Sequence, residues 1–269
     1  MAFLRSTLET LNLTGKPSKG PKIKPESKKK AHSIPSLPFE VVVMAGGKGE
    51  RLSPLTDDLP KPLVKIGNRP IAEYSIIRLQ KAGVKHFTFC VNHFGEQIAA
   101  HFGDGSDWGL TFEYIFEPKP LGTMGGVALK ENFVYDDLLV INGDLLTTIN
   151  FEKFFAFFVE EDADMAVATI PYRINLPYGI IELDDQHVIS SIKEKPTFTY
   201  HINCGIYFVR KELLQLVPAN KRFDAIELIE TAMRAGKKVS SFPVMEYWID
   251  IGKMDDYQKA QEDVQFLDF

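Results

Sequence analysis

A short apolar run that leads directly into a glycine-rich, basic turn is the feature that most constrains the fold. Residues 41–44 read VVVM, and a continuous apolar stretch of this length predicts a strand buried on both faces. The turn that follows, residues 45–56, reads AGGKGERLSPLT. Its glycines allow several backbone N–H groups to point at one centre, which is an arrangement that binds anions. The sequence therefore predicts a buried strand that carries an anion-binding turn at the edge of a sheet.

Similar apolar runs alternate with helix-like segments further along the chain. Strands are expected at residues 86–91, 138–141 and 165–170, and helices at 70–83, 96–102 and 151–159. This alternation is typical of an α/β fold, with a Rossmann-like, mostly parallel sheet and helices on both faces. Shorter strands expected at 179–182, 188–193 and 205–209 form a small mixed β extension. Ligands bind beyond the carboxyl ends of parallel strands, so the loops after Met44 and Ile141 are expected to share one edge.

Charge is distributed unevenly between the first 39 residues and the rest. The net charge is −5, but residues 1–39 carry a balance of +6, which leaves −11 for residues 40–269. Residues 1–39 are predicted to be a flexible basic tail or linker because Pro, Gly and Lys dominate residues 14–38. Residues 40–269 are expected to form one domain. An acidic domain argues against nucleic-acid binding.

The apolar runs and the cysteines indicate the cellular setting. No apolar run approaches the ~18 residues of a transmembrane helix, so membrane insertion is not expected. The two cysteines, Cys90 and Cys204, show no spacing typical of a metal site or a disulfide framework. A reduced, cytoplasmic protein is expected.

Further motifs follow the glycine-rich turn in a fixed order. They are PKPL at 60–63, LGTMGG at 121–126, NGD at 142–144, YG at 178–179, EKP at 194–196, NCG at 203–205 and YWIDIG at 247–252. With these motifs the chain resembles the sugar-1-phosphate nucleotidylyltransferase family over roughly residues 40–266. The resemblance implies the nucleotide-diphospho-sugar transferase fold. It also implies an enzyme that transfers a nucleoside monophosphate from a nucleoside triphosphate (NTP) to a sugar-1-phosphate and releases pyrophosphate.

The resemblance also implies roles for individual residues. Arg51 and Lys61 would neutralise phosphates, and Lys195 would hold the sugar phosphate. Nucleotide contacts are implied for Ala45, Gly46, Gly47, Gly49, Gly122, Thr123 and Asn142, and sugar contacts for Gly143, Gly179, Glu194 and Asn203. Asp144 and Asp250 are implied as ligands of Mg²⁺, which prefers few protein oxygens alongside phosphates and water.

The chemistry of this reaction fits such a set of residues. A sugar phosphate is already ionised at neutral pH, so the attacking oxygen needs no general base. The barrier comes from repulsion between two anions and from charge that builds up on the departing pyrophosphate, and cations and positioning lower it. These residues also have purely structural interpretations. An aspartate after a strand is often a turn residue or helix cap, and residues 194–196 fit a solvated turn. The pairing of Asp144 with Asp250 rests on the resemblance alone.

The sequence is compatible with several functions. Thymidylyltransferases of the family typically carry Gln in the segment that corresponds to Leu121–Gly126, whereas this chain has Thr-Met-Gly-Gly there, so the resemblance favours GTP as the nucleotide. The motifs at 177–179 and 246–248 resemble those of enzymes that use mannose-1-phosphate or glucosamine-1-phosphate, so these are the favoured sugars, for glycan synthesis. A thymidylyl- or uridylyltransferase is the alternative within the family. A catalytically silent regulatory homologue that binds nucleotide-sugars, or an adaptor that acts through the basic tail, are the alternatives outside it. The resemblance is compatible with a homo-oligomer.

Overall fold

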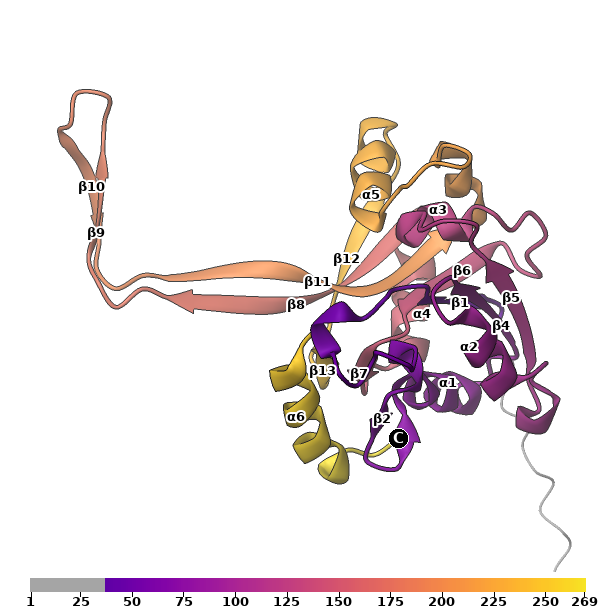
Figure 1. Ribbon diagram of the computed structural model, residues 1–269. Coiled ribbons are helices and arrows are strands. Elements are labelled where there is room, and N and C mark those ends of the chain that lie inside the picture. Colours follow the sequence, from indigo (N-terminus) through magenta and orange to yellow (C-terminus); the bar gives the residue numbers. More distant parts are fainter. Residues whose placement is uncertain (1–36) are drawn as a thin grey trace, which may run out of the picture. The chain divides into compact units, whose positions relative to one another are not determined.

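A computed structural model describes residues 37–269 and shows a seven-stranded central sheet (Figure 1). The strand order is β12-β8-β11-β6-β1-β4-β5. The strands are β1 (Glu40–Ala45), β4 (His86–Val91), β5 (Thr111–Phe116), β6 (Asp137–Asn142), β8 (Met165–Asn175), β11 (Thr197–Arg210) and β12 (Val239–Pro243). Only β11 runs antiparallel to its neighbours β6 and β8 among these pairings. The predicted mostly parallel α/β sheet is confirmed.

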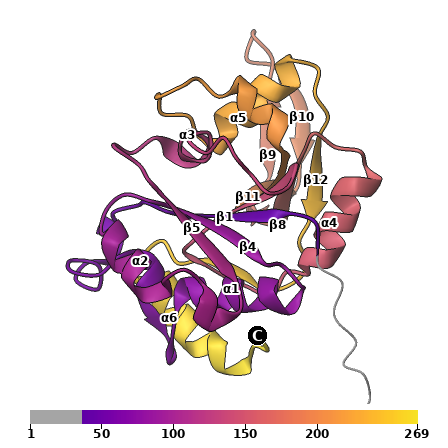
Figure 2. The same cartoon turned by 90° about the vertical axis from the view of Figure 1, so that its right-hand side faces the viewer.

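Helices cover both faces of this sheet (Figure 2). One face packs against α1 (Ile71–Lys81), α2 (Gly95–Phe102) and α4 (Phe151–Glu160), and the other against α3 (Gly122–Val127) and α5 (Ala225–Arg234). Aromatic side chains fill the first interface: the rings of Phe154 and Phe158 lie 4.8 and 5.4 Å from that of Phe208. Each fully buried side chain of this size contributes about 1.5–3 kcal/mol, so this layer holds the strands of the site in place.

A smaller layer lies beside the carboxyl ends of the central strands. It contains β2 (Lys65–Ile66), β3 (Arg69–Pro70), β7 (Leu145–Thr147), β13 (Trp248–Asp250) and α6 (Met254–Asp263). Short 3-10 helices are η1 (Glu50–Leu52), η2 (Lys61–Leu63), η3 (Ser106–Trp108), η4 (Lys211–Leu216) and η5 (Val264–Phe266). The antiparallel pair β7–β13 places Asp250 opposite Leu145. The chain therefore returns, after about a hundred residues, to the position directly after Asp144.

The expected mixed β extension forms a long two-stranded ladder, residues 171–202, which we name the arm. Beyond Ile170 in β8 and Ile202 in β11 these strands pair only with each other, whereas their inner halves also pair with β12 and β6. The tip of the arm is a separate antiparallel sheet of β9 (Ile180–Leu183) and β10 (Ile189–Lys193) (Figure 1). The arm is thus an extension of β8 and β11, which lie between the edge strand β12 and the parallel strand β6.

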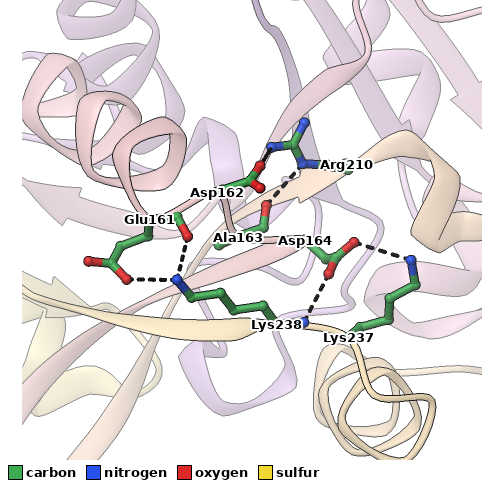
Figure 3. A network of polar contacts seen from close by, with 7 residues as sticks. All are labelled: Glu161, Asp162, Ala163, Asp164, Arg210, Lys237 and Lys238. Atoms are coloured by element: carbon green, nitrogen blue, oxygen red, sulfur yellow. Dashed lines mark hydrogen bonds and ion pairs between the residues drawn. The ribbon is translucent and has the colours of Figure 1, made fainter.

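A polar network fixes the ends of β8 and β11 opposite the arm. It joins Glu161, Asp162, Ala163, Asp164, Arg210, Lys237 and Lys238 (Figure 3). Arg210 donates from Nε to the Ala163 carbonyl at 3.0 Å and from Nη2 to Asp162 Oδ1 at 2.8 Å. Asp164 Oδ2 accepts from the Lys238 backbone N–H at 2.9 Å. The arm therefore extends from strands whose inner ends are held by side chains as well as by the sheet.

Two expectations concern residues near or beyond the described range. The predicted basic tail lies almost wholly outside residues 37–269, although its last residue, Phe39, is fully buried in the core. Within residues 37–269 no helix has the length and apolar character needed to cross a bilayer.

Candidate active site

The glycine-rich turn lies directly after β1, at the carboxyl edge of the sheet. Gly49 has φ 70°, a left-handed conformation that favours glycine, and Thr56 Oγ1 donates to its carbonyl at 2.9 Å. A Cβ atom on Gly46 would lie 2.7 Å from Glu117 Oε2, so the turn can pass this carboxylate only without a side chain. The turn is thereby fixed against the next strand while its outer surface stays open.

An open cleft lies between this turn, β6 and α3. It consists of two adjoining cavities of about 320 and 680 Å³, which share Gly46, Gly47, Pro120, Asp144 and Arg222. The remaining lining residues are Met44, Lys48, Gly49, Glu50, Arg51, Lys61, Glu117, Gly122, Thr123, Asn142, Asp224 and Gly252. Both volumes lie in the range of small-molecule sites. The prediction that the loops after Met44 and Ile141 share one edge is confirmed by this lining.

Two aspartates and one lysine lie together on the floor of the cleft. Lys61, only 9% exposed, forms an ion pair with Asp144 and lies 3.9 Å from Asp250 Oδ1. Burial and the neighbouring Asp144 charge raise the pKa of Asp250, and the cations Lys61 and Arg51 counteract this rise. Two carboxylates and two cations, Lys61 and Arg51, therefore lie close together at this point.

The carboxylate oxygens here fit a divalent cation. Asp144 Oδ1 and Asp250 Oδ1 are both buried and accept no hydrogen bond from the described residues. Within residues 37–269 no cluster of three or more His, Cys, Asp or Glu could hold a metal ion. A cation bound by these two oxygens would take its remaining ligands from water and substrate phosphates, which is the usual situation of Mg²⁺.

Cations surround the rest of the glycine-rich turn. Arg51 belongs to η1, and its Nη2 would lie 3.4 Å from a Cβ atom on Gly252, two residues after Asp250. Lys48 is exposed on the turn and lies 3.6 Å from Glu50. With Lys61 from η2, these side chains surround a volume that is open to solvent and positively charged on this side. The arrangement suits the oxygens of a triphosphate.

The second wall of the cleft is the start of α3. Gly122 has φ 73°, and a Cβ atom there would lie 2.3 Å from Asp224 Oδ1, which also accepts from the Thr123 N–H at 3.3 Å. Gly122, Thr123 and Asn142 line the cleft together with the glycines of the first turn. Of the nucleotide-binding residues implied by the sequence, only Ala45 does not line it, because it is the buried last residue of β1.

Glu117 is a lining residue that the sequence did not single out. It directly follows β5, where its N–H donates to the Val91 carbonyl at 2.8 Å, and it is 9% exposed. Its Oε1 atom has no hydrogen-bond partner among the described residues and would lie 2.5 Å from a Cβ atom on Gly126. Burial raises the pKa of this carboxyl, and the Leu121 N–H partly offsets the rise. An acidic residue directly after a strand was the signal available in the sequence, but β5, a partly exposed edge strand, was not predicted.

The residues implied for the sugar phosphate lie in two places. Gly143 lies beside β1, where its N–H donates to the Met44 carbonyl at 2.9 Å, and Asn203 lies at the inner end of the arm. Glu194 and Lys195 lie on the arm itself, with side chains 72% and 68% exposed. Gly179 lies with them, since a Cβ atom there would be 2.9 Å from Glu194 Oε2. The structure does not bring this arm cluster (Gly179, Glu194, Lys195) to the lining of the cleft, and its sugar-phosphate role stays a prediction.

Comparison with known proteins places the chain in a family. A family model described as nucleotidyl transferase matches residues 40–265. A D-glycero-alpha-D-manno-heptose 1-phosphate guanylyltransferase from Aneurinibacillus thermoaerophilus is 32% identical over 234 residues, which are 84% of this chain and 99% of that protein. A mannose-1-phosphate guanylyltransferase from Mycobacterium tuberculosis is 28% identical, and the match covers 84% of this chain and 64% of that longer protein.

A solved structure agrees with these matches. The crystal structure of HddC from Yersinia pseudotuberculosis is similar with a TM-score of 0.65 and 27% identity, over 84% of this chain and 99% of HddC. The family match spans both the glycine-rich turn and Asp250, so it includes every residue of the cleft described above. The resemblance seen in the ordered motifs is confirmed: this chain belongs to the nucleotidyl transferase family.

Proposed function

We propose that this chain transfers GMP from GTP to a sugar-1-phosphate and releases pyrophosphate. Glu117 is the observation that carries the choice of GTP. Glu117 lines the cleft, its carboxylate lies between Gly46 and Gly126, and its buried Oε1 atom has no hydrogen-bond partner among the described residues. Guanine presents two adjacent donors, N1–H and the exocyclic N2 amino group, and a carboxylate accepts from both. Uracil and thymine present one N–H between two carbonyls, and adenine and cytosine pair their amino group with an acceptor nitrogen, so each would place an acceptor near the carboxylate.

The phosphate chemistry follows from the cations around the turn. An oxygen of the sugar phosphate attacks the α-phosphorus of GTP, a new P–O bond forms, and the bond to the β-phosphate oxygen breaks so that pyrophosphate leaves. No proton has to move, because the nucleophile is already ionised. Arg51 and Lys61 would balance the charge of the triphosphate, and the N–H groups of residues 46–49 would orient it.

Asp144 and Asp250 would hold Mg²⁺ through their unpartnered oxygens. The bound ion would supply charge neutralisation and a fixed orientation of the phosphate oxygens. Because the ion would balance the two carboxylates, the positive charge of Lys61 would be left to face the phosphates in the cleft. Because both aspartates are bonded within the small layer beside the sheet, their positions depend on the β7–β13 pairing rather than on a mobile loop.

The sugar belongs to the class used by the relatives. Both curated relatives are named guanylyltransferases of manno-configured sugar phosphates. We place mannose-1-phosphate, glucosamine-1-phosphate and the heptose phosphate together as candidates, with the nucleotide-sugar supplied to glycan synthesis. The buried, unpaired thiols of Cys90 and Cys204 fit a reduced cytoplasmic setting.

Pyrophosphate release tests the proposal. The protein is incubated with Mg²⁺, each of GTP, UTP, dTTP, CTP and ATP, and each of these sugar phosphates together with glucose-1-phosphate. Release that requires both GTP and one sugar phosphate is expected. A preference for UTP or dTTP would refute the role of Glu117, and no release by a folded protein from any pair would favour the silent regulatory homologue.

A further inference from the structure

The arm carries an apolar surface that nothing in the described chain covers. Large apolar side chains on it are exposed by about half or more, among them Tyr172, Tyr178, Ile181, Leu183, Ile189 and Ile192. Soluble proteins rarely expose contiguous apolar patches of this kind unless the patch binds something. The exposed apolar side chains therefore indicate that the arm binds another surface, and this inference does not depend on the chemistry in the cleft.

The pairing within β9 and β10 places four of these side chains together. Ile181 pairs with Ile192 and Leu183 with Ile189, and Ile181 and Leu183 are two residues apart, so they share one face of the small sheet. A two-stranded sheet alone is at best marginally stable in water and needs a third strand or another packed surface. The four side chains (Ile181, Leu183, Ile189 and Ile192) thus form one uncovered face of a hairpin that needs a cover.

The same arm holds residues that the cleft lacks. Gly179, Glu194 and Lys195 match the family motifs for the sugar phosphate but lie on the exposed arm. Family motifs divided between an arm and a cleft indicate that the working site combines the two.

The geometry favours a second copy of the chain as the source of the arm. The ladder between β8 and β11 is regular from Ile170–Ile202 to Asn175–Thr197 and runs away from the cleft-lining strands (Figure 1). Its register shift lies at the base of the arm, between Asn203 and Tyr207, and the network around Arg210 holds the strand ends beyond that shift (Figure 3). Folding the arm back onto its own cleft would require this base to rearrange or the ladder to bend, whereas a two-fold partner can receive the arm unchanged.

We propose that two copies of this chain exchange their arms. Each copy covers the apolar face of the other's β9–β10 sheet and receives the partner's Lys195 at the open side of its cleft. Two such contacts, each between one copy's arm and the other copy's body, are related by a two-fold axis and form a closed, isologous dimer. The role given to Lys195 rests on the proposed function, whereas dimerisation through the arm does not.

The first test measures the oligomeric state and needs no substrate. Light scattering after size exclusion is expected to give twice the chain mass for the wild type and the single chain mass for the double variant Ile181→Glu/Ile192→Glu. Met233→Glu is the matched control, because Met233 is 62% exposed, close to the 65% of Ile192, and lies on α5 away from the arm. A monomeric wild type, or a dimer that survives the arm variant with an unchanged melting curve, would overturn the proposal.

A second test detects the exchange itself. A chain with Lys195→Cys is mixed with a differently tagged chain with Arg222→Cys, and a short bifunctional maleimide is added. Arg222 lines the cleft and is 73% exposed, while the native cysteines are buried. A covalent dimer that contains both tags is expected. A chain that carries both Lys195→Cys and Arg222→Cys is treated in parallel. If this chain cross-links within itself and the mixture gives no covalent dimer, the arm folds back onto its own cleft and the exchange is refuted.

A third test links the exchange to catalysis. Asp144→Asn damages the cleft and Lys195→Ala damages the arm, so each variant alone is expected to be inactive. After mixing and equilibration, ~25% of wild-type turnover is expected, because half of randomly assorted dimers are mixed and each mixed dimer contains one intact site. No recovery, with dimers and cross-links present, would refute the catalytic role of the partner's Lys195. An inactive wild type would refute the proposed function and leave the exchange supported by the first two tests.

Discussion

Replacement of Glu117 by glutamine tests how the cleft selects its base. Glu117→Gln keeps the shape of the side chain but replaces one acceptor oxygen by an amide donor. The side chain lies between Gly46 and Gly126, where added Cβ atoms would come within 2.7 and 2.5 Å of its oxygens, so it has little room to turn aside. A bidentate contact to guanine is worth about 1–3 kcal/mol of discrimination. The ratio of kcat/KM for GTP over UTP is therefore expected to fall roughly 5- to 150-fold.

The same substitution is expected to raise stability. Burial raises the pKa of Glu117, so the ionised form costs folding free energy that neutral glutamine does not. The direction of the shift sets the pH window: below the unfolded-state pKa of about 4.3 both states of Glu117 are protonated and no gain is expected. As the pH rises through the raised folded-state pKa, the wild type loses stability relative to the variant. The variant should therefore melt at higher temperature at neutral pH and at the same temperature in acid.

These opposite effects separate base recognition from damage to the fold. The assay combines kcat/KM for GTP and UTP with thermal melts across pH, and Glu131→Gln is the matched control because Glu131 is exposed and outside the cleft. The control should change neither quantity. Unchanged selectivity in Glu117→Gln, or an equal loss with every triphosphate, would refute the contact between Glu117 and guanine.

Three further outcomes follow from the cleft. Asp144→Asn should keep the melting temperature within a few degrees yet lose about a hundredfold or more of the Mg²⁺-dependent turnover, since an amide is a poor Mg²⁺ ligand; wild-type turnover would contradict the metal site. Arg51→Ala should lower kcat/KM by about 10²-fold and change the free energy of unfolding by less than about 0.5 kcal/mol, measured with denaturant, because Arg51 is exposed and has little packing to lose. The KM for GTP should rise as pH falls through the raised pKa of Glu117, because protonation removes an acceptor; a KM that is constant through this range would contradict the contact.

The sequence predicted the central strands well because they are buried on both faces. The strand expected at 86–91 has these bounds in the structure, and the strand expected at 138–141 is longer by one residue at each end. β5 was not predicted because Thr111 and Glu113 interrupt its apolar pattern at the edge of the sheet. α5 was also missed, although Asp224 and Glu227 form a capping box that is readable three residues apart.

The arm and the site depend on contacts that one sequence does not display. β8 continues to Asn175 and β11 begins at Thr197, well beyond the strands expected there, because the outer halves are exposed and carry no burial pattern. The meeting of Asp144 with Asp250 follows from the β7–β13 register, which joins distant segments through backbone hydrogen bonds. Their proximity could be inferred only from the family resemblance.

Buried polar side-chain atoms without hydrogen-bond partners are concentrated at the cleft within residues 37–269. Of the five such side-chain atoms within residues 37–269, three belong to Glu117, Asp144 and Asp250; Glu117 and Asp144 line the cleft, and Asp250 lies next to Asp144 and Lys61. Each unsatisfied group costs about 1–3 kcal/mol, and the fold gains nothing from placing them together. Two adjacent N–H donors would satisfy the first and a divalent cation the other two. These unpartnered atoms are therefore the groups on which the proposed binding of guanine and of a metal ion rests.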